Sequence, residues 1–306
     1  MTEKRYREIH TETAEEFFGK LNPVTVDHYR PSNLIYRGQE NSEWPLTPSI
    51  FRHYGEKLPH HHPVSLSFFE CGILSNFSNY LGGINLSDHR NKSLNDCFSK
   101  ILEDGPEEEG VAKALQNWPR IEALEFMALC QHAGVPTRLL DWTYNPYVAA
   151  HFAAYSSAVN RKPPERMAVW RCDKDYTLDA RMNSEPNHGD FSTRVYRLEP
   201  PFWGSNPNAI AQSGCFLFIK GITSKEFYNL DSNIIIHEKP EENHLVKITV
   251  PSSEANKIID LCELFGVSRS KLFRTYEGCA EHLRQKMQDI LKEVISLDYS
   301  KVKECD

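Results

Sequence analysis

The segment from Gln131 to Thr143 constrains the fold more than any other part of this 306-residue chain. It concentrates a His, an Arg, an Asp, a Trp, a Gly and a Pro, and apolar helical patterns flank it at 121–129 and 146–155. A loop that only joined two helices would need a turn signal and little else. Binding and catalytic side chains gather on loops that a core scaffold positions. The segment therefore predicts a functional loop held between two buried helices.

A second dense segment begins with a short apolar pattern, 34–38, which predicts a buried strand that ends at Arg37 and Gly38. An arginine at such a place needs a planar anionic partner, either a carboxylate or a phosphate. Arg37 is therefore interpreted as a ligand for phosphate or carboxylate, with a structural ion pair to Asp141 or to a nearby Glu as the alternative. Gly38 permits a close approach of two backbones, and a plain turn explains it equally well.

Several residues of the central loop carry two interpretations each. His132 follows a helix, where it acts as a general acid or base or else bonds to a terminal carbonyl. Arg138 and Asp141 are three residues apart, so an internal ion pair that braces the loop is expected. Trp142 stacks on a nucleobase or a nicotinamide ring, or belongs to the core.

The end of this loop and a third dense segment, 211–216, add further polar candidates. Thr143 and Asn145 are residue types that cap helices, and Pro146 suits a first helical turn. Gln212 precedes an apolar strand pattern, where an amide must bond either to backbone groups or to a ligand.

Composition narrows the class of protein. The net charge of −7 is spread along the chain and argues against a surface built for nucleic-acid phosphates. The eight cysteines form no CxxC pair, which favours free buried thiols in a reducing compartment, and three adjacent histidines at 60–62 cannot all face one ion. No apolar run is long enough for a membrane span, and the N-terminus lacks the apolar core of a signal peptide. We expect a cytoplasmic protein without a metal site and without a membrane partner.

The order of helical and strand patterns predicts the fold class. Helical patterns dominate the first half and strand patterns the second, without a βα alternation. This favours an α+β fold with a small mixed or antiparallel sheet flanked by helices, in a single domain over 11–285, followed by a helix end and polar tail at 286–306. Strands are predicted at 34–38, 168–172, 194–198, 215–219, 233–237 and 244–250.

The three dense segments together resemble the FRG domain family. Its Arg-Gly signature corresponds to Tyr36-Arg37-Gly38-Gln39, and its Gln-His-x-Gly-x-Pro-Thr-Arg-Leu-Leu-Asp-Trp-Thr pattern runs from Gln131 to Thr143. A third pattern, Ala-Gln-x-Gly-x-Phe, corresponds to 211–216. The resemblance covers roughly 11–285. It departs from the family at 208–209, where this chain has Asn-Ala in place of the frequent Arg-Ile.

More weakly, the order of these segments is similar to that of mono-ADP-ribosyltransferases, whose cofactor is NAD. The resemblance implies that Arg37 holds the pyrophosphate or ribose and that Gln212 orients the acceptor or a ribose hydroxyl. The usual catalytic glutamate is not evident. The implied catalytic set is Arg37, His132 and Gln212. The implied cofactor-binding set is Tyr36, Arg37, Gly38, Thr137, Arg138, Trp142 and Thr143. The residues expected to brace the loop are Asp141, Gln131 and Asn145.

The sequence leaves three functions open. The first is an NAD-using, ADP-ribosyltransferase-like effector that modifies a protein or nucleic acid, with a toxin or anti-phage role implied by the family alone. The second is a non-catalytic module that binds a nucleotide or a nucleic acid. The third is a hydrolase or nuclease that uses His132 and Asp141. For all three functions we expect the same five residues to lie in one cleft: Arg37, His132, Arg138, Asp141 and Gln212.

Overall fold

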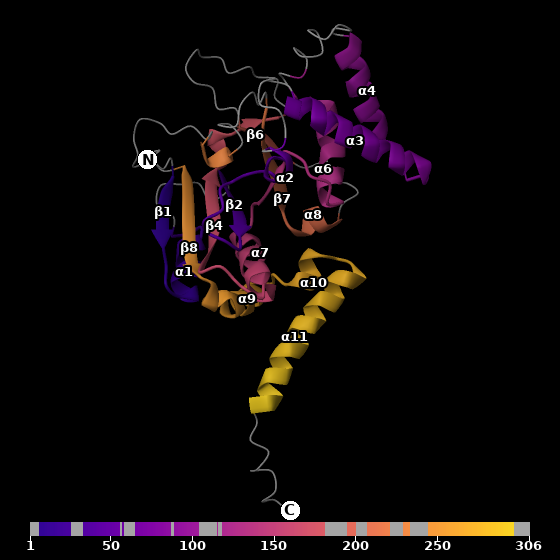
Figure 1. The fold of residues 1–306 in the computed structure, drawn as a ribbon. Helices are drawn as coiled ribbons and strands as arrows, with labels where there is room; N and C mark the ends of the chain where they lie inside the picture. The colour runs from indigo at the N-terminus through magenta and orange to yellow at the C-terminus, as the bar shows by residue number, and fades with distance from the viewer. Residues whose placement is uncertain are drawn as a thin grey trace, which may run out of the picture.

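The chain folds around one mixed sheet of eight strands, flanked by helices (Figure 1). This computed structural model describes residues 6–25, 33–55, 57, 65–86, 89–103, 115, 118–180, 195–199, 207–220, 229–232 and 244–296. The predicted α+β class with a mixed sheet is confirmed. The histidines at 60–62, the strand predicted at 233–237 and the end of the tail beyond residue 296 lie outside the described residues.

The sheet has the strand order β1-β8-β4-β2-β3-β7-β6-β5. Neighbouring strands are antiparallel except in the two edge pairs, β1 with β8 and β5 with β6. Five of the predicted strands are present within a residue or two of their predicted ends. The strands are β1 (Arg7–His10), β2 (Leu34–Gln39), β3 (Leu140–Thr143), β4 (Arg166–Asp173), β5 (Leu178–Asp179), β6 (Val195–Leu198), β7 (Gly214–Ile219) and β8 (Leu245–Pro251).

Two groups of helices cover the sheet. The helices α1 (Ala14–Leu21), α7 (Pro146–Val159) and α9 (Ala255–Leu264) pack with β2, β4 and β8 in one apolar cluster. A second group packs with β6 and β7: α3 (Ser65–Gly83), α4 (His89–Glu103) and α6 (Ile121–His132). A third cluster, to which α2 (Ser49–Tyr54) belongs, lies on the opposite face of the sheet, as alternate residues of β7 show.

The structure describes three further α-helices and three 3-10 turns. They are α8 (Pro207–Ala211), α10 (Arg269–Leu272), α11 (Tyr276–Ser296) and three single 3-10 turns, η2 (Lys174–Tyr176), η4 (Leu230–Ser232) and η5 (Ser252–Glu254). None of the helices in the described ranges combines the length and apolar character that a membrane crossing requires. The domain boundary expected at residue 285 falls inside α11 and stays a prediction.

The sheet opens between β2 and β3. These strands form one register pair, Tyr36 with Thr143, whereas β2 pairs with β4 over six residues and β3 with β7 over four. The two strands therefore separate beyond that pair. The segment expected to be a loop ends in strand β3 because its last four residues pair with β7. This separation creates the space in which the motif residues meet.

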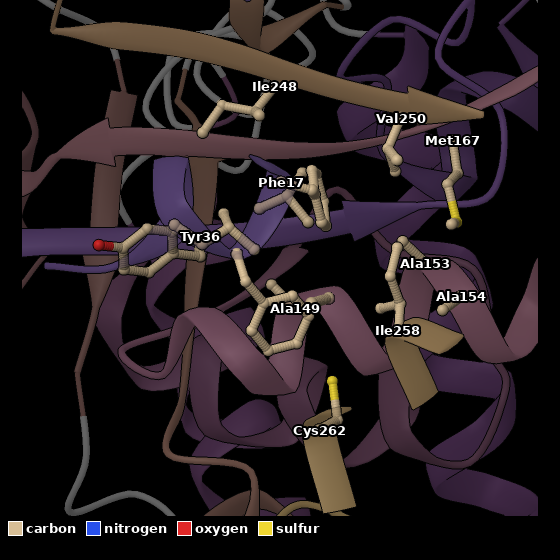
Figure 2. Packing of buried hydrophobic residues seen from close by; sticks show 14 of the residues in the cluster. Phe17, Tyr36, Ala149, Ala153, Ala154, Met167, Ile248, Val250, Ile258 and Cys262 are labelled. Carbon is tan, nitrogen blue, oxygen red and sulfur yellow. The ribbon is translucent and has the colours of Figure 1, made fainter. Parts of the chain in front are cut away.

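Gly38 is required by close packing. A Cβ atom at this position would lie 2.0 Å from the Ala149 carbonyl oxygen and 2.9 Å from the Ala153 nitrogen. Of the two interpretations offered above, close backbone approach is the observed one. Small residues of α7, including Ala149, Ala153 and Ala154, line its contact with the sheet beside Tyr36 (Figure 2). The glycine of the Arg-Gly signature thus seats α7 directly against β2.

Candidate functional site

A pocket of about 760 Å³ lies where β2 and β3 separate. All three dense sequence segments contribute to its wall. The lining residues are Tyr36, Arg37, Gly38, Gln39, Glu40, Trp44, Pro45, Thr47, Arg52, Gln131, His132, Asp141, Trp142, Thr143, Ala149, Phe152, Ser156, Gln212 and Phe273. The predicted convergence therefore holds for every named residue except Arg138.

The pocket reaches both faces of the sheet. Tyr36 and Arg37 are consecutive on β2, so their side chains leave on opposite faces, and both line the pocket. The same is true of Asp141 and Trp142 on β3. The pocket lies where the ladder between β2 and β3 stops.

Two well-capped helix ends hold the central loop. At the end of α6, Gly134 has a φ of 85°, and the Val135 N–H donates to the Cys130 carbonyl at 2.9 Å. At the start of α7, the Asn145 side chain accepts a hydrogen bond from the Tyr147 N–H at 2.9 Å. Asn145 thus caps a helix and does not line the pocket.

Arg37 is the best-placed cation in the pocket. Its side chain is 14% exposed, its Nη1 donates to the Asp141 carbonyl oxygen at 2.7 Å, and the Asp141 carboxylate lies 3.8 Å away. Burial lowers the pKa of the guanidinium to about 10, while Asp141 acts to raise it and Arg52 to lower it. The observed pair with Asp141 is single and long, so Arg37 keeps donors for a second anionic partner.

Three buried donors of the pocket have no hydrogen-bond partner among the described residues. They are the Tyr36 hydroxyl, the Arg37 Nε and the Trp142 Nε1. Burial raises the pKa of Tyr36 to about 12, so its hydroxyl remains a donor at neutral pH. Buried polar groups are nearly always paired, because an unpaired one loses its hydration without compensation. All three donors belong to residues that line the pocket.

Gln131, and not Arg138, braces Asp141. The Gln131 Nε2 donates to the Asp141 carboxylate at 3.1 Å, and its Oε1 accepts from the Thr137 hydroxyl at 2.8 Å. Thr137 is fully buried, and its N–H donates to the Ser49 hydroxyl at 3.1 Å. Thr137 therefore supports the wall of the pocket from behind, which corrects its placement in the cofactor-binding set.

Arg138 is committed to a different network. Its Nε donates to the Glu70 carboxylate at 2.5 Å, its N–H to the other oxygen of that carboxylate at 2.8 Å, and its remaining nitrogens to Ser67 and two carbonyls. Trp118 donates to the same carboxylate at 2.8 Å. All three residues are fully buried or nearly so. The expected bridge to Asp141 is therefore wrong, and so is the assignment of Arg138 to the cofactor set.

Gln212 lines the pocket with its amide already engaged. The Nε2 donates to the Leu272 carbonyl at 3.2 Å, and the Gln212 carbonyl accepts from the Thr143 hydroxyl at 2.6 Å. The next residue, Ser213, has a φ of 48°, a conformation that residues other than glycine rarely adopt. Gln212 thus ties the start of β7 both to β3 and to the segment that leads into α11.

Glu40, Ser156 and Phe273 line the pocket although they were not predicted as site residues. Glu40 directly follows β2, so its position after the Arg-Gly signature was an available signal. Ser156 lies one turn beyond Phe152 on α7 and shares its face. Phe273 comes from a segment more than a hundred residues beyond the central loop, and no local pattern marks it. Within the described residues, no group of three or more potential metal ligands occurs.

Comparison with known proteins gives one match. The model of the FRG domain family matches residues 32–162, a range that includes the Arg-Gly signature and the whole central loop. The Gln212 segment lies outside this range. No curated protein and no solved structure matched the chain.

Proposed function

We propose, from the premise that this chain carries an FRG domain over residues 32–162, that its pocket binds a nucleotide of the NAD type and that the protein is an ADP-ribosyltransferase-like enzyme. The observation that carries this proposal is the set of three unpaired buried donors, one of which belongs to the Arg37 guanidinium, beside a second guanidinium, that of Arg52. A pyrophosphate flanked by ribose hydroxyls has the density of acceptors that such a set can satisfy.

The pocket holds two guanidinium groups, which favour an anionic ligand, and two carboxylates, Glu40 and Asp141. Arg37 and Arg52 both line it, and burial lowers the pKa of each guanidinium. A base whose pKa is lowered by burial and by a neighbouring cation gains from a bound anion, because the anion offsets both effects. Guanidinium groups suit phosphate oxygens, which they bind through parallel N–H donors.

The apolar part of the pocket supports a ring-containing ligand. Trp44, Trp142, Phe152 and Phe273 line the pocket together with Tyr36. Aromatic side chains stack on nucleobases and similar rings through offset contacts. The volume of about 760 Å³ lies within the range of pockets that hold small molecules and cofactors.

The strand order supports the transferase resemblance. Arg37 on β2, Thr143 on β3 and Gln212 before β7 come from three strands that are consecutive in the sheet. In the transfer, the bond between the nicotinamide nitrogen and ribose C1′ breaks, nicotinamide leaves with the electron pair, and the acceptor forms the new bond and loses a proton. A carboxylate stabilises the positive charge that develops on the ribose. Glu40 and Asp141 are the carboxylates of the lining.

A non-catalytic nucleotide-binding module is the second candidate, and one observation favours it. The Gln212 amide, which occupies the position expected to orient the acceptor, donates to the Leu272 carbonyl. An amide that already donates to a backbone carbonyl has less capacity to stabilise a transition state than an amide without such a partner.

Calorimetry with NAD and with ADP-ribose, together with transfer from labelled NAD to protein and nucleic acid, separates the candidates. We expect both ligands to bind and label to be transferred. Arg37→Ala is expected to weaken binding roughly 10- to 100-fold, whereas Arg161→Ala, which removes an exposed arginine outside the pocket, should leave it unchanged. Binding without transfer would favour the module. No binding of either ligand at millimolar concentration would refute the proposal.

A further inference from the structure

Helix α11 extends away from the rest of the chain (Figure 1). Ion pairs hold its first half: Glu281 lies 2.6 Å from Arg269, and Lys286 lies 2.7 Å from Glu263 on α9. The second half, shown in gold in Figure 1, projects beyond α9. The projecting part therefore has a side that the described residues of its own chain leave uncovered.

That side is apolar. The exposed residues follow the spacing i, i+4, i+7, i+8, i+11 and i+12, which places them on one face of a helix. Their exposed fractions run from 38% at Val294 to 73% at Ile295. The stripe consists of Leu283, Met287, Ile290, Leu291, Val294 and Ile295.

The spacing within this stripe is that of a coiled coil. Ala280, Leu283, Met287, Ile290 and Val294 alternate at intervals of three and four residues, which is the heptad pattern of helices that pair along a narrow seam. Such a seam is filled by another helix with the same repeat. A second copy of α11 carries that repeat by definition.

The charges of α11 argue against a lipid surface. Helices that lie on membranes carry an excess of Lys and Arg on their polar side. Here acidic and basic residues are interspersed and nearly balanced, as on the outer faces of coiled coils. The charged residues are Glu277, Glu281, Arg284, Lys286, Asp289, Lys292 and Glu293.

The area is sufficient for a dimer. Six large side chains that each expose on the order of 100 Å² would bury about 1,200 Å² when two helices pair, the lower limit of stable interfaces. Half of this area belongs to the stripe of one copy, and an exposed apolar patch of that size is at the upper end of what monomers carry.

We propose that the apolar stripe of α11 pairs with the same stripe of a second copy, so that the protein is a homodimer. Phe273, which lines the pocket, precedes the start of α11 by three residues, and the stripe begins seven residues further along the helix at Leu283. This inference does not depend on the ligand of the pocket.

Sedimentation of the full chain across micromolar concentrations tests the pairing. We expect twice the 35.3 kDa mass of one chain for the wild type. Ile290→Glu should give the mass of one chain and still melt in a cooperative transition, at a temperature lowered by the loss of pairing. Gln288→Glu, which adds the same charge to the same helix outside the heptad seam, should remain dimeric. A wild-type monomer at all concentrations, or a dimer that Ile290→Glu does not change, would overturn the proposal.

A cross-linking experiment keeps the test decisive should Ile290→Glu fail to fold. In a Cys279→Ser background, Met287→Cys is expected to form a disulfide between two copies under mild oxidation, and Gln288→Cys is expected not to. Equal cross-linking at both positions would contradict the proposal that the two helices pair along the heptad seam. Co-sedimentation of a monomer with anionic phospholipid vesicles would show a lipid surface instead, and would also overturn the proposal.

Discussion

The two arginines of the motifs lie in regions with opposite designs. Arg138 is fully buried, and Glu70, Ser67 and two carbonyls accept hydrogen bonds from it. Arg37 borders a pocket, has one 2.7 Å hydrogen bond to a carbonyl, and leaves its Nε without a partner among the described residues. The first region, the Arg138–Glu70 network, joins elements of the core. The second is open on one side. The same residue type therefore stabilises the core at position 138 and is available to a candidate ligand at position 37.

Removal of the network carboxylate is the severest test of this contrast. Glu70→Ala leaves the Arg138 charge buried without its counter-ion, and it also leaves the Trp118 N–H without its acceptor. We expect a loss of roughly 3–5 kcal/mol in the free energy of unfolding, measured by urea denaturation. Glu122→Ala, which breaks a partly exposed pair with Lys100, should cost under about 1 kcal/mol. Similar losses of unfolding free energy in both variants would show that the Arg138–Glu70 network stabilises the fold no more than an ordinary surface ion pair.

Acid provides a further test through His151, a buried residue of α7 that is not part of the pocket lining. The side chain is 1% exposed, and burial lowers its pKa to about 4, with Arg269 and His282 contributing. Between about pH 6.5 and pH 4 the unfolded chain binds a proton that the folded chain does not. Stability should therefore fall as the pH falls through this range, by up to roughly 3 kcal/mol.

His151→Leu is expected to remove this part of the pH dependence while leaving the stability at neutral pH within about 1.5 kcal/mol. Urea midpoints from neutral pH down to pH 4 make the comparison. An unchanged slope in the variant would assign the acid sensitivity to other groups.

Gly38 tests how closely α7 must approach β2. In Gly38→Ala the new methyl group meets the Ala149 carbonyl, so we expect a loss of about 1–3 kcal/mol together with weaker ligand binding as the pocket wall moves. Gly19→Ala is the matched control. It lies in α1 with open space around it, and it should stabilise the chain by about 0.5–1 kcal/mol. A neutral Gly38→Ala would mean that the contact relaxes easily.

Arg37→Ala should have the smallest effect on stability. Its partner Asp141 is 62% exposed and keeps the hydrogen bond from Gln131, so no charge is left buried. We expect less than about 1 kcal/mol of destabilisation, with nucleotide binding weakened roughly 10- to 100-fold through lost charge-assisted hydrogen bonds. A large drop in melting temperature with intact binding would make Arg37 structural and would erase the contrast with Arg138.

The sequence by itself determined the features that depend on neighbours along the chain. Apolar periodicity located α6, α7, β2, β4, β6, β7 and β8, and the residue types at Gly134 and Asn145 marked the ends of two helices. The concentration of polar residues in three segments also located most of the pocket wall. These signals are local, because capping and burial periodicity act within a few residues.

Only the tertiary structure decided which polar groups meet. Asp141 and Glu70 were equal candidates for Arg138 by charge, and Glu70 is its partner because α3 brings that carboxylate into the core from 68 positions away. Phe273 joins the pocket for the same kind of reason, through the placement of α10. The opening between β2 and β3 depends on how the two flanking helix groups pack, because β2 packs against α7 whereas β3 is hydrogen-bonded to β7. Long-range packing selects among chemically equivalent partners. The sequence pattern cannot make this selection, because it does not give the spatial distance between residues that are far apart in the chain.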